Sequence, residues 1–106
     1  MSKEYNKLVR DRIPEIIRKN GQEPVTRILD DQEYVEELIK KLKEEVAEFE
    51  ADRSIEELAD IREVVIALRE ALGIKSGELE EARRNKADRN GRFKKRIYLE
   101  GVQSSD

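Results

Sequence analysis

The chain has 106 residues, 44% of them charged and 5% aromatic, with a formal net charge of −3 at pH 7. This length suits one domain with a modest core, and the charge provides no global basic field for a nucleic acid polymer. Cysteine and histidine are both absent, which excludes disulfides, thiolate nucleophiles, histidine acid–base pairs and the usual zinc sites. Any catalysis must therefore use carboxylates, lysine, arginine, hydroxyl groups or a bound hard cation.

The N-terminal half predicts a short helix, a short strand and a long helix. Proline in the first turn of Ile13–Arg18 favours a helix that ends at Asn20-Gly21. The alternating, β-branched stretch Pro24–Leu29 indicates a strand. Asp30 or Asp31 caps the next helix. Its apolar residues recur at i, i+3, i+4 and i+7: Val35, Leu38, Ile39, Leu42, Val46 and Phe49.

A third helix follows a break at Glu50–Arg53, because Ser54 and Glu57 match a capping box. This helix is apolar on most sides from Ile61 to Leu72. A helix of this kind is packed on both sides, and in so small a chain the second side is expected to contact another subunit.

The C-terminal part predicts a polar fourth helix at about Ser76–Arg89 and a strand at Arg96–Leu99 that pairs with residues 25–29. The expected fold is mainly α, a bundle of about four helices with a small two- or three-stranded β element. It forms a single domain over residues 1–102, followed by a loose tail at 103–106.

Two pairs of carboxylates, each three residues apart, lie on the second and third helices: Glu45 with Glu48, and Glu57 with Asp60. Glu48 and Glu57 are about equally far along the chain from the short connection near Asp52, and so are Glu45 and Asp60. If the two helices are antiparallel neighbours, the two pairs therefore lie at the same level along the helix axes. Four carboxylates so close raise one another's pKa unless a cation joins them, and Mg²⁺ prefers such oxygen ligands. With 25 acidic residues in the chain, a solvated helix face explains the same spacing. Glu57 is separately explained as the capping-box partner of Ser54.

The run Glu44-Glu45-x-x-Glu48 followed by Glu57-x-x-Asp60 resembles the signature of the MazG-like, all-α nucleotide pyrophosphohydrolases. That superfamily includes phosphoribosyl-ATP pyrophosphohydrolase. The opening segment Asn6–Ile17 and the closing segment Lys86–Ile97 resemble those of its small single-domain branch. The resemblance therefore covers nearly the whole chain and implies an all-α NTP pyrophosphatase-like fold.

The resemblance also implies roles for residues of this chain. The metal ligands would be Glu45, Glu48, Glu57 and Asp60, and Glu44 would be a catalytic residue that orients a ligand or a water. The cofactor would be Mg²⁺, with Mn²⁺ as a substitute. The basic residues of the motifs are the candidates for binding the substrate: Lys7, Arg10, Arg12, Lys86 and Arg89.

The implied reaction is hydrolysis of a nucleoside triphosphate, standard or non-standard, at its α–β linkage to a monophosphate and pyrophosphate. Two alternatives stay open: phosphoribosyl-ATP hydrolysis, and a non-catalytic helical interaction module. The sequence contains no apolar run long enough for a bilayer and no signal-peptide pattern at its start. We therefore expect a cytoplasmic homodimer or homotetramer that binds a nucleotide and neither a membrane nor a nucleic acid polymer.

Overall fold

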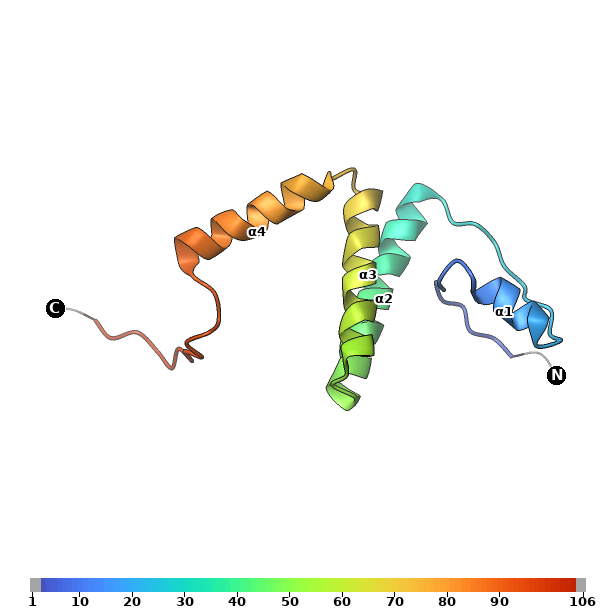
Figure 1. Ribbon diagram of the computed structural model, residues 1–106, viewed down its shortest axis with the longest axis horizontal. Helices are drawn as coiled ribbons and strands as arrows, with labels where there is room; N and C mark the ends of the chain where they lie inside the picture. The colour runs from blue at the N-terminus through green and yellow to red at the C-terminus, as the bar shows by residue number, and fades with distance from the viewer. Residues whose placement is uncertain (1–2, 105–106) are drawn as a thin grey trace. The chain divides into compact units, whose positions relative to one another are not determined.

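The computed structural model describes residues 3–104 of the chain, which contain four helices. These are α1 (Ile13–Lys19), α2 (Asp31–Ala51), α3 (Ile55–Ala71) and α4 (Ser76–Asn90) (Figure 1). The prediction of a mainly α protein is confirmed. The end of the tail predicted at 103–106 lies outside the described residues.

The predicted β element is not observed among residues 3–104. Segments 25–29 and 96–99 both have irregular backbone. Val25 and Ile28 are almost fully exposed, so these β-branched residues have no packed surface on which a strand would be stabilised.

Local capping signals define the first two helices. Proline occupies the first turn of α1, where its missing N–H costs nothing and its fixed φ suits a helix. The Asp30 carboxylate caps α2 by accepting a hydrogen bond from the Glu33 N–H at 2.8 Å. Both helices therefore begin where the sequence predicts.

Helix α3 is bounded by a serine at one end and a glycine at the other. Ser54 Oγ accepts a hydrogen bond from the Glu57 N–H at 3.3 Å. At the other end, Gly73 has a φ of 71°, and the Ile74 N–H donates to the Arg69 carbonyl at 3.0 Å. A left-handed glycine with this bond satisfies carbonyls at the C-terminus of a helix.

Helices α2 and α3 are antiparallel and pack against each other along their length (Figure 1). Two apolar side chains of the described residues are buried, Leu38 on α2 and Val64 on α3. The chain divides after Ile74 into two compact units, the first with α1, α2 and α3 and the second with α4. Over the residues described, no helix has both the length and the apolar composition needed to cross a membrane.

An exposed apolar stripe runs along α3. Leu58, Val65 and Leu72 are seven residues apart and are 52%, 36% and 58% exposed. On α2, Ile39 and Val46 have the same spacing and are also exposed. Seven-residue spacing keeps apolar side chains on one side of a helix and is typical of helices that pack side by side.

We propose that a second copy of the chain covers this α3 stripe, because exposed apolar side chains aligned along a helix favour association. Light scattering of the wild-type protein should then give a dimer or larger at low micromolar concentration. Val65→Glu places a charge in the middle of the stripe and should weaken association at least about tenfold, on the order of 1.4 kcal/mol. Glu63→Gln, on an exposed position of the same helix, should leave the mass unchanged. A stable wild-type monomer would contradict the proposal.

Candidate metal centre

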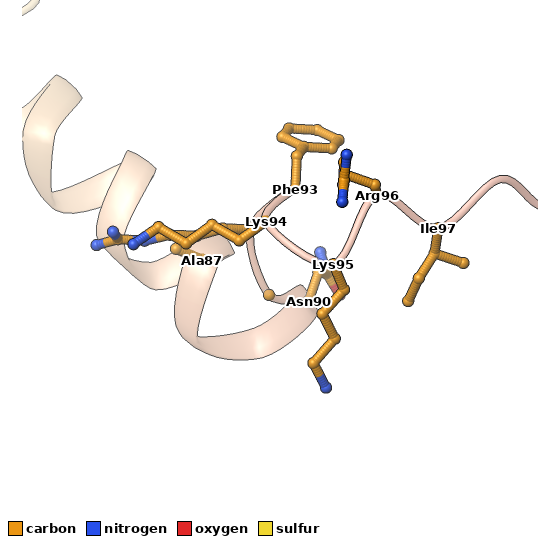
Figure 2. Close-up of a pocket in the computed structure, with 9 residues that line it drawn as sticks. Ala87, Asn90, Phe93, Lys94, Lys95, Arg96 and Ile97 are labelled. Carbon is orange, nitrogen blue, oxygen red and sulfur yellow. The ribbon is translucent and has the colours of Figure 1, made fainter.

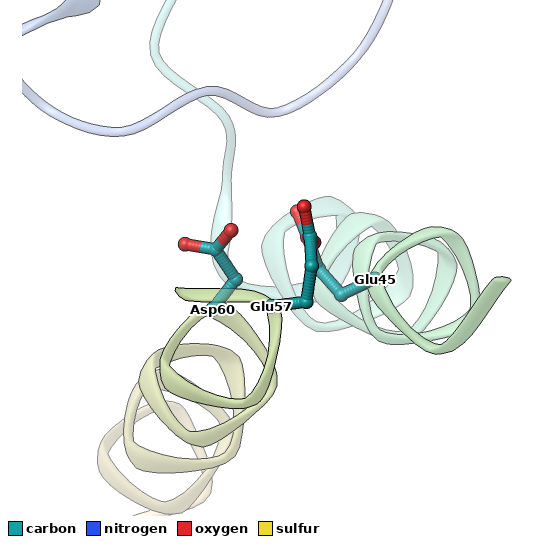
Figure 3. A group of neighbouring side chains, drawn as sticks. All are labelled: Glu45, Glu57 and Asp60. Atoms are coloured by element: carbon teal, nitrogen blue, oxygen red, sulfur yellow. The ribbon is translucent and has the colours of Figure 1, made fainter. Parts of the chain in front are cut away.

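Three carboxyl groups from two helices lie together on one side of the helix pair (Figure 3). They belong to Glu45 on α2 and to Glu57 and Asp60 on α3, and one oxygen of each lies within 4.8 Å of the others. The connection between α2 and α3 is short, so residues equally far from it stand at the same height on the two helices. Three of the four predicted metal ligands are thus neighbours.

Glu48, the fourth predicted ligand, lies at the edge of this group. Its carboxyl group is near enough to raise the pKa of Glu45, but it is exposed and is not among the three residues whose oxygens converge. Glu48 lies about one turn after Glu45 on α2, on a part of the helix surface that faces solvent.

Glu45 occupies a core position of α2. It is 5% exposed, and it lies seven residues after the buried Leu38, on the same face of the helix. Within the described residues, the Oε2 atoms of Glu45 and Glu57 are both buried and have no hydrogen-bond partner. Unpaired buried carboxylate oxygens are costly and uncommon. A hard divalent cation fits this set of oxygen donors.

The acidic groups perturb one another's ionisation. Burial raises the pKa of Glu45 above its ordinary value, and the nearby carboxyl groups of Glu48 and Asp60 raise it further, while Lys41 opposes the change. Burial also raises the pKa of Glu57, as do the charges of Asp60 and Glu45. Both shifts reflect a site in which the ionised carboxylates need a positive partner.

The carboxylate of Glu57 is not used in capping α3. The Ser54 N–H donates to the Asp52 carbonyl at 2.8 Å, and the helix is capped by a hydrogen bond from the Glu57 backbone N–H to Ser54 Oγ. Of the two hydrogen bonds of the predicted capping box, the one that Ser54 accepts is present. The Glu57 side chain does not make the other and lies in the acidic cluster instead.

Two basic residues of the irregular N-terminal segment contact the acidic residues. Arg10 Nη2 lies 2.6 Å from Asp60 Oδ1, and Lys7 Nζ lies 3.2 Å from Glu44 Oε1. Both pairs are partly exposed. The segment is shaped in part by Asn6, whose φ of 45° is in the left-handed region that asparagine tolerates. The opening motif is thereby brought to the acidic site.

Glu44 is held by two lysines. Lys7 contacts it from the N-terminal segment, and Lys41 Nζ lies 3.4 Å from its Oε1. Burial would raise the pKa of Glu44, but hydrogen bonding and charge from the two lysines outweigh burial and lower it. Glu44 is therefore ionised at neutral pH.

Lys41 is a site residue that the sequence analysis missed. Its Nζ lies 3.4 Å from both Glu44 Oε1 and Glu45 Oε1. Lysine three and four residues before two glutamates is a recognisable helix pairing, so the spacing alone would have indicated it.

The other predicted substrate-binding residues are Arg12, Lys86 and Arg89. Arg12 Nε pairs with Glu15 at 3.3 Å at the start of α1. Lys86 and Arg89 are exposed on α4, in the second compact unit. Of the five predicted residues, Lys7 and Arg10 are the two that the first unit brings to the acidic groups.

Comparison with known proteins gives a partial match. An uncharacterized protein of Mycolicibacterium smegmatis is 61% identical to this chain over 44 residues, which make up 42% of this chain. The same residues are 45% of that protein, so the chain spans about half the length of the relative it matches. No family model and no solved structure matches the chain.

The raised pKa values predict how the metal-free protein responds to pH. A carboxyl group whose pKa is higher in the folded than in the unfolded state contributes stability below its unfolded pKa, near 4.5 for Glu45. That contribution is lost as pH rises through the folded pKa. Glu45→Gln should therefore raise the melting temperature in EDTA at pH 7, with a gain that shrinks as pH falls toward 4.5.

The matched control for this experiment is Glu50→Gln, an exposed position on the same helix. Its melting temperature should stay close to that of the wild type across the pH range. If Glu45→Gln melts below the wild type at pH 7 in EDTA, the carboxylate is stabilised by protein contacts alone and the centre has no need of a cation.

Proposed function

We propose that this protein is a Mg²⁺-dependent nucleotide pyrophosphohydrolase that acts in the cytoplasm as a homodimer or homotetramer. The observation that carries the proposal is the buried Glu45 carboxylate, whose Oε2 has no partner among the described residues and which lies beside Glu57 and Asp60. The resemblance of the three motifs to MazG-like enzymes supports the assignment of a nucleotide as the substrate.

The residues divide into a metal-binding and a phosphate-binding set. Glu45, Glu57 and Asp60 would hold Mg²⁺, and Glu48, one turn after Glu45 on α2, would be the fourth ligand. Mn²⁺ has similar ligand preferences and would substitute. A bound ion would polarise the phosphoryl oxygens and neutralise part of the triphosphate charge.

The proposed reaction is attack of water on the α-phosphorus. The new bond joins the water oxygen to this phosphorus, the α–β anhydride bond breaks, pyrophosphate leaves, and the attacking water gives up a proton to the solvent. Lys7 and Arg10 lie beside the acidic groups, where their charge would offset the charge that grows on the leaving group. Glu44 orients Lys7, because its carboxylate is the group that Lys7 contacts.

The first experiment is a panel of nucleoside triphosphates, standard and damaged, together with phosphoribosyl-ATP, assayed for pyrophosphate release with Mg²⁺. Hydrolysis of a triphosphate supports the proposal. Preference for phosphoribosyl-ATP indicates the histidine-synthesis reaction. No release from any member indicates a non-catalytic module.

Asp60→Asn tests the metal set in the same assay. The amide keeps the size of the side chain but removes a charged ligand, so kcat/KM should fall at least about a hundredfold, on the order of 2.7 kcal/mol. Helical content by circular dichroism should be unchanged, and the rise in melting temperature that Mg²⁺ gives the wild type should be lost. Wild-type turnover in this variant would remove the proposed site.

Arg10→Ala separates phosphate binding from metal binding. Arg10 pairs with Asp60 at 2.6 Å and therefore competes with a cation for that carboxylate. Removal of the guanidinium should tighten Mg²⁺ binding in the absence of nucleotide, measured by calorimetry, and should lower kcat/KM at least about tenfold, on the order of 1.4 kcal/mol.

Arg18→Ala, an exposed position on α1, is the control that removes the same charge from the same unit. It should change neither quantity. Unchanged turnover together with a lower melting temperature in Arg10→Ala would show that Arg10 has only a structural role.

A further inference from the structure

The segment after α4 is strongly basic. Residues 92–96 are Arg-Phe-Lys-Lys-Arg, and residues 83–96 contain eight basic residues and one acidic residue. The acidic residues of α4 are concentrated earlier, at Glu78, Glu80 and Glu81. This gives the second unit a short positive surface in a chain whose net charge is −3.

The backbone folds this segment into a tight turn, which we call the basic turn (residues 91–97). Gly91 ends α4 with a φ of 84°. The Arg96 N–H donates to the Phe93 carbonyl at 3.0 Å, and Arg96 itself has a φ of 57°. A residue other than glycine in the left-handed region carries strain, which often accompanies functional sites.

An open hollow of about 490 Å³ lies at the surface of the basic turn (Figure 2). The residues that line it include Asn90, Arg92, Lys94, Lys95 and Arg96. This volume lies within the range of small-molecule pockets, roughly 300 to 1,000 Å³. The hollow is therefore large enough for a nucleotide.

The positive charges around the hollow are not neutralised by the described residues. Earlier on α4, Arg83 and Arg84 both pair with Glu80, at 2.6 and 3.4 Å. For Arg92, Lys94, Lys95 and Arg96, by contrast, no ion pair is recorded within residues 3–104. Four like charges within five consecutive residues repel one another, and an anion bound at the turn would relieve that repulsion.

Phe93 adds an aromatic surface to the same hollow. Its side chain is 95% exposed, and Figure 2 shows its ring projecting from the turn beside Arg96. An exposed aromatic ring among cationic side chains is a suitable stacking surface for a nucleobase.

We propose that the basic turn binds the phosphate chain of a nucleotide, with the base stacked on Phe93. The choice of a nucleotide rests on the proposed function, whereas the binding of a phosphate chain rests on the turn alone. A nucleic acid strand is less well matched, because a strand needs a positive groove several nucleotides long and acidic residues of α4 end the basic surface.

Calorimetry on the full-length protein in EDTA, with sodium tripolyphosphate as the ligand, tests the phosphate site without metal. Lys94→Gln/Arg96→Gln should weaken binding at least about tenfold, since charge-assisted contacts to phosphate are strong. Lys40→Gln/Lys43→Gln on α2 removes the same charge from exposed positions and should have little effect. Equal weakening by both double variants would overturn the proposal in favour of a general charge effect.

The base is tested by comparing ATP with tripolyphosphate. Phe93→Leu should weaken ATP binding at least about fivefold and leave tripolyphosphate binding unchanged, because stacking involves the base alone. Equal loss for the two ligands would overturn the role of Phe93. A single-stranded ten-nucleotide RNA that binds more tightly than ATP would identify the turn as a nucleic acid surface and overturn the proposal.

Failure of this inference is distinguishable from failure of the proposed function. If the nucleotide panel gives no turnover but tripolyphosphate binding depends on Lys94 and Arg96, the phosphate site stands and the enzymatic proposal fails. If the wild type hydrolyses nucleotides while Lys94→Gln/Arg96→Gln binds tripolyphosphate normally, the enzymatic proposal stands and the phosphate site is wrong.

Discussion

Burial of the Glu45 carboxylate between α2 and α3 is the constraint on which the first unit depends. The position is one that packing would give to an apolar residue, since Leu38 is buried seven residues earlier on the same face. An apolar residue in place of a buried charge is often neutral or stabilising, so packing gives no reason for an acid here. The unpaired Oε2 atoms of Glu45 and Glu57 supply a reason, because a bound cation would pair them.

The helices could be predicted because their ends depend on neighbouring residues. Asp30 and Ser54 cap the helices that follow them, and Gly73 adopts the positive φ that ends α3. The two strand predictions depended on a distant partner. Alternation at Pro24–Leu29 indicates how a strand would orient its side chains, but it does not supply the surface on which they would pack.

The candidate site could be predicted in part, for a similar physical reason. A short connection fixes the relative heights of residues on two antiparallel helices, so Glu45, Glu57 and Asp60 followed from counting. Which side chains point inward depends on rotation of each helix about its axis, and this leaves Glu48 exposed. The pairing of Arg10 with Asp60 joins residues 50 positions apart through an irregular segment, and no local pattern encodes it.

The acidic site and the apolar core both lie at the contact between α2 and α3. Acidic side chains take one side of the α2–α3 contact, and Leu38 and Val64 are the apolar side chains buried in the described residues. The ion pairs of Lys7 and Arg10 are partly exposed, so each adds on the order of 0 to 1 kcal/mol. Such pairs do not offset the burial of Glu45. A cation bound at the acidic centre and a second copy on the apolar stripe of α3, both of which we propose, would each add stability, and folding would then be linked to cation binding and association.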